Sequence, residues 1–168
     1  MADELNLEHG RVEGWPAIGL QLESLLLHAL QGGARRIVAL DPDFLQWPLS
    51  SPALLQALQD WGKGRGRRLE LLAPTWQPCA RRHVRLLAWR KSFDHLLDIR
   101  EFDPRDGVAN WPLSLLAVEG GVALRVIEFE TGRAVWRSDA GFRQLALEEF
   151  DAIAQRSGPG WPLTTLGL

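Results

Sequence analysis

The chain has 168 residues, 46% of them hydrophobic and 24% charged, which is typical of a globular protein with one buried core. Its formal net charge of −2 excludes an overall electrostatic attraction to nucleic acid or to a membrane surface. A single cysteine, Cys79, excludes an intrachain disulfide and a cysteine-based metal cluster. We expect a flexible arm over 1–15, one domain over 16–157 and a tail over 158–168.

The first two thirds of the chain alternate between predicted helices and short strands. Pro16 opens a helix whose apolar residues share one face, and the Ser51–Pro52 pair is a typical helix start. The unalternated apolar run at 37–40 is typical of a strand covered on both faces. The predicted helices lie at 16–31, 51–61 and 79–95, and the predicted strands at 37–40, 69–73 and 97–102.

The last third predicts three strands joined by tight turns, followed by a helix that Asp139 caps. The strands lie at 113–118, 122–129 and 134–137. The whole order predicts an α/β fold with a mixed, largely parallel sheet flanked by helices. Ligands of such sheets usually bind beyond the carboxyl ends of the strands. Here the segments 41–43, 75–76 and 103–104 follow those ends.

The segment WPLSLLAVEGG, residues 111–121, and this element order resemble one half of a phospholipase D-like domain, as in uncharacterised proteobacterial proteins. In that superfamily a late strand carries the pattern H-x-K-x4-D, followed by glycine. Aligning Glu119–Gly120 with the family's Asp-Gly places Pro112 at the histidine position and Ser114 at the lysine position. Proline is no nucleophile and serine carries no charge, so the resemblance implies a degenerate copy that cannot form a phosphohistidine.

The resemblance therefore implies a non-catalytic phospholipase D-like half-domain that acts as an interaction or regulatory module, without a cofactor or a metal. Single-half members of the superfamily build their site from two copies, so it also implies a homodimer. A protein partner is a further possibility. The acidic, polar N-terminus lacks the features of a secretory signal, and no apolar run is long enough to span a membrane. We expect a cytoplasmic protein with no membrane partner.

A phosphate-ester hydrolase or nuclease is the alternative function. Asp41 and Asp43 follow a predicted strand with the D-x-D spacing of Mg²⁺-dependent phosphatases. His83, two residues before Arg85, offers a second, shifted site. The competing interpretations are an ordinary turn at Asp41–Asp43 and a histidine on a structural helix.

A nucleic-acid-binding module is a further alternative, because 17 of the 19 basic residues are arginines, which form forked contacts to phosphate. The competing interpretation is the solvated face of an ordinary helix. The candidates are Arg65, Arg67, Arg68, Arg81, Arg82 and Arg85.

Overall fold

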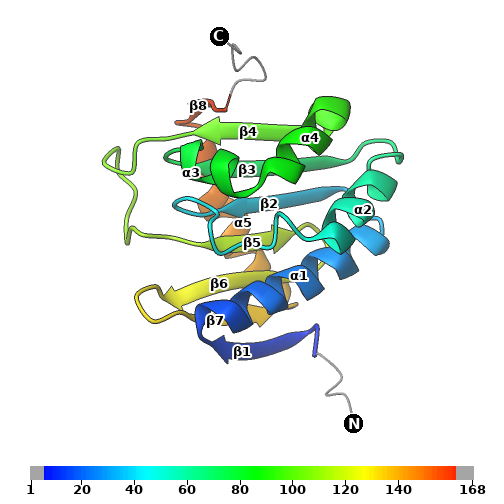
Figure 1. Cartoon of the computed structure of the whole chain (residues 1–168). Coiled ribbons are helices and arrows are strands. Elements are labelled where there is room, and N and C mark those ends of the chain that lie inside the picture. Colours follow the sequence, from blue (N-terminus) through cyan, green and yellow to red (C-terminus); the bar gives the residue numbers. More distant parts are fainter. Residues whose placement is uncertain (1–5, 162–168) are drawn as a thin grey trace.

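Residues 6–161 are described by the computed structural model, which forms one eight-stranded sheet with helices on both faces (Figure 1). The helices are α1 (Trp15–Gln31), α2 (Pro52–Trp61), α3 (Gln77–Arg82), α4 (Val84–Phe93), the 3-10 helix η1 (Asp94–Leu96) and α5 (Ala140–Ala154). The strands are β1 (His9–Glu13), β2 (Arg36–Leu40), β3 (Arg68–Ala73), β4 (Leu97–Glu101), β5 (Leu115–Val118), β6 (Ala123–Glu128), β7 (Arg133–Arg137) and β8 (Gly158–Pro159).

The strands follow the order β1-β7-β6-β5-β2-β3-β4-β8. β2, β3 and β4 are parallel and are connected through the helices, as the alternation predicts. The predicted mixed α/β sheet with flanking helices is confirmed. The balance within the sheet differs from the expectation, because five of the seven strand pairings in residues 6–161 are antiparallel. The antiparallel pairings come from the β5–β7 meander and from the edge strands β1 and β8.

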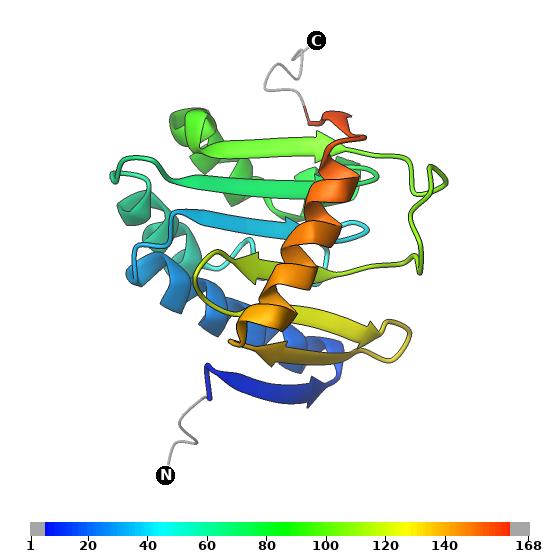
Figure 2. The same ribbon diagram turned by 180° about the vertical axis from the view of Figure 1, so that it is seen from behind.

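Two hydrophobic layers lie on the two faces of the sheet. Helices α1 to α4 cover one face, and α5 alone crosses the other face (Figure 2). β2 contributes to both layers: Ile37 and Ala39 join the larger cluster, while Val38 and Leu40 join the smaller cluster under α5. All four side chains are buried, which explains why this strand shows no polar alternation in the sequence.

The expected arm over 1–15 is wrong for residues 9–13, which form β1 and pair antiparallel with β7. The segment HGRVE has one large aliphatic residue, so no hydrophobic pattern indicates a strand. The expected tail over 158–168 is also partly wrong, since β8 pairs with β4 and Trp161 is buried. Residues 1–5 and 162–168 lie outside the described part of the chain.

The helix predicted over 79–95 is divided into α3 and α4 at His83, whose φ of −115° and ψ of 59° are not helical. His83 turns into the protein, and its backbone therefore leaves the helical path. We call the turn between the two helices the α3–α4 elbow. None of the helices in residues 6–161 has the length and apolar composition needed to cross a membrane.

Candidate functional site at the carboxyl edge of the sheet

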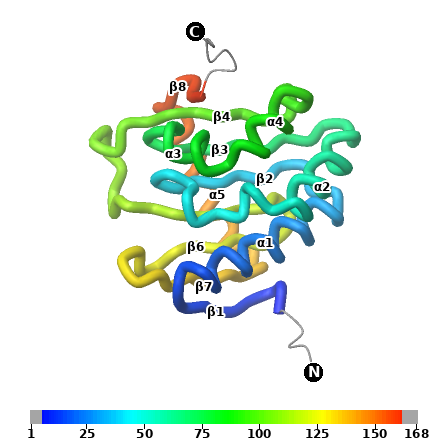
Figure 3. The backbone as a smooth tube through the Cα atoms, in the orientation of Figure 1, coloured from blue at the N-terminus to red at the C-terminus, as the bar shows by residue number. Residues whose placement is uncertain are grey.

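The carboxyl ends of β2, β3 and β4 meet the beginning of β5 at one edge of the sheet. β5 runs antiparallel to β2 with Leu115 opposite Leu40, so the adjoining residues Ser114 and Asp41 are neighbours. The segment 102–114 passes along this edge from β4 to β5 (Figure 3). The structure thus brings together two of the residues that the sequence singles out.

Asp41 is 3% exposed, and its carboxylate is held by the loop that follows it. Oδ2 accepts hydrogen bonds from the backbone N–H groups of Asp43 (3.1 Å) and Phe44 (2.7 Å). Oδ1 accepts one from Nε1 of Trp47 at 3.0 Å. Burial raises the pKa of Asp41, and the nearby Ser114 hydroxyl and these three donors oppose that rise. Asp41 therefore organises the loop over 41–47.

Asp43 also has a structural use, because its Oδ1 accepts a hydrogen bond of 3.0 Å from the backbone N–H of Leu45. No group of three or more His, Cys, Asp or Glu side chains suited to a metal ion occurs in residues 6–161. The hydrogen bonds of both carboxylates are those of an ordinary turn at Asp41–Asp43.

Ser114, at the lysine position of the family pattern, is 1% exposed. Its hydroxyl lies close enough to Asp41 to lower the pKa of that carboxyl, yet Oγ has no hydrogen-bond partner of good geometry within the described residues. Pro112 is exposed before β5, and Glu119 is exposed in the turn after it. The three aligned positions therefore flank β5: Pro112 and Ser114 precede it, and Glu119 follows it.

His83 is 2% exposed, and both ring nitrogens have partners. Nε2 lies 2.8 Å from the carbonyl oxygen of Phe44, so Nε2 carries the hydrogen and donates it. Nδ1 then accepts a hydrogen bond of 2.6 Å from the hydroxyl of Ser50. Burial lowers the pKa of His83, and the charge of Arg82 lowers it further. This neutral imidazole is a structural anchor of the α3–α4 elbow.

Cys79 lies one helical turn before His83 and is fully buried. Burial raises the pKa of its thiol to about 12, and the negative charges of Asp41 and Asp43 act in the same direction. The thiol is therefore not a nucleophile near neutral pH.

Aromatic rings fill the helix-covered side of this edge. Phe44 contacts Trp47 edge-on and stacks on Trp76, with ring centroids 5.0 and 5.2 Å apart. Trp76 stacks on Trp161 at 5.8 Å, and the guanidinium of Arg90 lies 5.2 Å from the Trp161 ring centroid. We call Trp47, Phe44, Trp76 and Trp161 the aromatic column. No motif in the sequence predicts this column, although the position of Trp76 just beyond β3 is a signal.

An open hollow of about 390 Å³ lies beside the ends of β3 and β4. Asp103 pairs with Arg105 at 2.8 Å, and that contact lowers the pKa of Asp103 to about 2. Arg156 donates to the backbone carbonyl of Asp106 at 2.8 Å and so supports the neighbouring loop. The lining residues are Pro74, Glu101, Phe102, Asp103, Pro104 and Arg156, and neither Pro112 nor Ser114 is among them.

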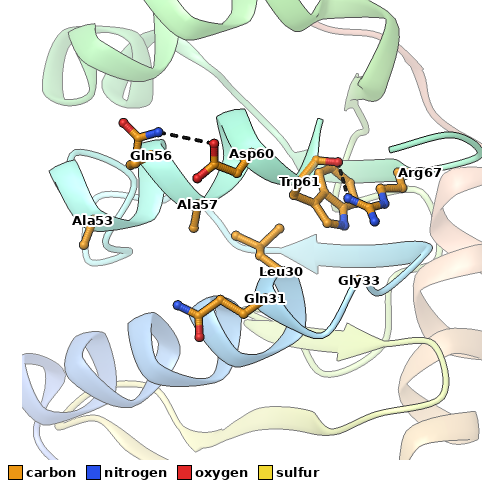
Figure 4. Close-up of a pocket in the computed structure, with 9 residues that line it drawn as sticks. All are labelled: Leu30, Gln31, Gly33, Ala53, Gln56, Ala57, Asp60, Trp61 and Arg67. Atoms are coloured by element: carbon orange, nitrogen blue, oxygen red, sulfur yellow. Dashed lines mark hydrogen bonds between the residues drawn. The ribbon is translucent and has the colours of Figure 1, made fainter. Parts of the chain in front are cut away.

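A separate pocket of about 340 Å³ lies between α1 and α2 (Figure 4). Its polar side chains are engaged locally: Gln56 donates to Asp60 at 3.4 Å, and Arg67 donates to the backbone carbonyl of Trp61. No nucleophile and base face each other in it. The lining residues are Leu30, Gln31, Gly33, Ala53, Gln56, Ala57, Asp60, Trp61 and Arg67.

The six candidate arginines do not form one surface. Arg65, Arg67 and Arg68 precede or begin β3, whereas Arg81, Arg82 and Arg85 lie on α3 and α4, beyond its carboxyl end (Figure 1). Arg68 pairs with Asp98 at 3.0 Å, and Arg67 holds the end of α2. The three elbow arginines are exposed and form no ion pair with the described residues.

No family model matches the sequence, and no curated protein matches it. Solved structures of low sequence identity do match. Nuc from Salmonella typhimurium, a phospholipase D family member, has a TM-score of 0.58 and 13% identity over 92% of this chain and 100% of its own. NucT from Helicobacter pylori has a TM-score of 0.60 and 6% identity over 92% and 99% of the two chains.

The archaeal chromatin protein TrmBL2, described as showing a novel mode of DNA binding, has a TM-score of 0.64 and 17% identity. The match covers 95% of this chain but 56% of TrmBL2, so this chain spans little more than half of that protein. The predicted fold is confirmed: the chain has a phospholipase D-like fold.

Proposed function

We propose that this chain is a non-catalytic phospholipase D-like domain that acts as an interaction or regulatory module. The observation that carries the proposal is the burial of Ser114 beside Asp41, at the position where the family pattern has its lysine. A phosphate group cannot reach a side chain that is 1% exposed without a rearrangement of the edge. Pro112, at the histidine position, supplies neither a nucleophile nor a proton donor.

The other reactive side chains at this edge have structural partners. His83 has no free ring nitrogen, Asp41 accepts three hydrogen bonds, and the Cys79 thiol has a pKa of about 12. The aromatic column occupies the space beside them. Catalysis of phosphoryl transfer needs an accessible nucleophile or an activated water, and these contacts leave none of the three groups free for either task.

The test is an assay of the purified protein with bis-(p-nitrophenyl) phosphate, p-nitrophenyl phosphate and plasmid DNA, each with Mg²⁺ and with EDTA. We expect no turnover above that of a blank purification. Turnover that disappears in His83→Ala or Asp41→Asn, while circular dichroism shows both variants folded, would contradict the proposal. Turnover that persists unchanged in both variants would indicate a contaminating enzyme.

We further propose a homodimer, which the family resemblance implies. In the described part of the chain, the exposed large apolar side chains lie on five separate segments: Leu20, Leu45, Val84, Ile127 and Leu145. Light scattering coupled to gel filtration measures the molar mass directly. A monomer at micromolar concentration would contradict this proposal and leave the non-catalytic one standing.

Nucleic-acid binding is a second candidate function. DNA binding is a property described for TrmBL2, and the shared fold alone does not transfer it to a chain of 17% identity. The observation in this chain that favours it is the group of exposed arginines at the α3–α4 elbow.

A further inference from the structure

The charge of the chain is unevenly distributed. Residues 77–93, which form α3, His83 and α4, contain five basic residues and no acidic residue. The rest of the chain has 14 basic and 21 acidic residues, so it carries a net charge of −7 against +5 for this segment. The small overall charge of −2 thus conceals one strongly basic region.

Four of these five basic side chains face solvent. Arg81, Arg82, Arg85 and Lys91 are exposed and form no ion pair with the described residues, and we call them the elbow basic surface. Arg90 is buried instead, where it pairs with Asp94 and donates to the backbone carbonyl of Trp161. The one acid of the adjoining helix α2, Asp60, pairs with Lys63. Asp43, close enough to α3 to act on the Cys79 thiol, accepts a hydrogen bond from the backbone N–H of Leu45.

The backbone under this surface is fixed. His83 turns inward and contacts Phe44 and Ser50, while Leu86 and Trp89 are buried in the core. These contacts hold the end of α3 and the beginning of α4, from which the arginines project. A fixed backbone lowers the entropy that is lost when the arginines bind a partner.

The composition of the surface indicates a phosphate ligand. Guanidinium groups form forked hydrogen bonds to phosphate, and three of the four side chains are arginines. A membrane-binding helix needs an exposed apolar face, whereas the only large apolar side chain that α3 and α4 expose is Val84 (62%). Neither helix exposes an aromatic ring on which a base could stack.

We infer that the elbow basic surface binds the phosphodiester backbone of a nucleic acid without reading its sequence. This inference rests on the second candidate function and specifies its site. The proposed site includes Arg81, Arg82 and Arg85. It leaves out Arg67 and Arg68, whose side chains already have partners in the fold. Contacts to phosphates give affinity that falls steeply with salt and depends little on base sequence.

The experiment is fluorescence anisotropy of a labelled DNA duplex of about 20 base pairs, titrated with the full chain in EDTA at several salt concentrations. The test variant is Arg81→Gln/Arg82→Gln/Arg85→Gln. The matched control is Arg11→Gln/Arg35→Gln/Arg137→Gln, which removes the same charge from three exposed arginines that have no ion pair in residues 6–161.

We expect the chain to bind the duplex at low salt, with affinity that falls as salt rises. The elbow variant loses on the order of 10-fold or more in affinity. The slope of log affinity against log salt concentration becomes shallower by about 2 to 3, because each lost phosphate contact reduces that slope by about 0.9. The control variant stays within about 2-fold, and a duplex of scrambled sequence binds equally well.

Three results would overturn the inference: no binding at about 50 mM salt, equal losses in the two variants, or full competition by polyglutamate. The inference would also be overturned if the elbow arginines were needed for binding to vesicles of equal parts phosphatidylserine and phosphatidylcholine but not for binding to DNA. The same samples, incubated with Mg²⁺ and run on a gel, report cleavage separately. Cut DNA would contradict the non-catalytic proposal and leave the binding inference standing.

Discussion

Nε2 of His83 lies 2.8 Å from the carbonyl oxygen of Phe44, and this contact joins the α3–α4 elbow to the loop after β2. Because burial lowers the pKa of His83, the unfolded chain, with a pKa near 6.5, binds a proton more readily than the folded chain. The contribution of His83 to stability is therefore complete above about pH 6.5 and is lost as the pH falls below it.

Urea unfolding at a series of pH values measures this effect, with His83→Gln as the comparison. Folding raises the pKa of Asp41, so the unfolding free energy falls as the pH rises above 3.8. This effect is the same in the wild type and in His83→Gln, and it cancels in the comparison. The difference in unfolding free energy between wild type and variant should shrink as the pH falls from about 7 to 5. A difference that stays constant would show that His83 does not titrate in this range.

Ser114 is a buried hydroxyl without a hydrogen-bond partner of good geometry in the described residues. Ser114→Ala should therefore change the unfolding free energy by about 1 kcal/mol or less. Ser114→Lys places a charge in the same space and should be destabilising by about 3 kcal/mol or more. We also expect Pro112→His/Ser114→Lys to gain no phosphodiesterase activity. A folded, active double variant would contradict the structural account of this edge.

Trp76 lies at the centre of the aromatic column, between Phe44 and Trp161. Trp76→Ala should lower the unfolding free energy by about 3–5 kcal/mol. The substitution leaves a cavity, and the backbone carbonyl of Arg100 loses the hydrogen bond that Nε1 of Trp76 donates. Leu20→Ala is the control: Leu20 is 68% exposed, so the expected change is within about 0.5 kcal/mol. Similar losses in both variants would mean that the column contributes no special stability.

Asp41 and Asp43 form a matched pair within one turn. Asp41→Asn replaces an acceptor oxygen with an N–H₂ group that faces donors, and should lower the unfolding free energy by about 1–3 kcal/mol. Asp43→Asn should cost about 0.5 kcal/mol, since Asp43 accepts a single local hydrogen bond. If the pair instead formed a Mg²⁺ site, adding Mg²⁺ would raise the melting temperature of the wild type alone.

The sequence predicts the central strands well, because residues 37–40 of β2 and 71–73 of β3 are apolar and buried. The side chains of Ser51 and Asp139 are typical of helix starts. Ser51 caps α2 and Asp139 caps α5, as expected. The division of the third helix was not predictable, because His83 is pulled inward by Phe44, 39 positions earlier in the chain.

The candidate site was predicted only in its parts. The adjacency of Asp41 and Ser114 depends on the antiparallel pairing of β2 with β5, which the local sequence does not specify. The aromatic column likewise joins residues from three separate segments, from the loop with Phe44 and Trp47 to Trp76 and Trp161. The absence of acidic residues from 77–93, in contrast, is visible in the sequence itself.

β1 has a consequence for the order in which the protein forms during synthesis. Within residues 6–161 its one partner strand is β7, with Glu13 opposite Arg133, 120 positions later. β1 therefore leaves the ribosome well before the strand with which it pairs. Contacts of such large sequence separation slow folding, so we expect β1 to join the sheet late. Because β1 has few apolar side chains, its exposure to water before it pairs with β7 costs little free energy.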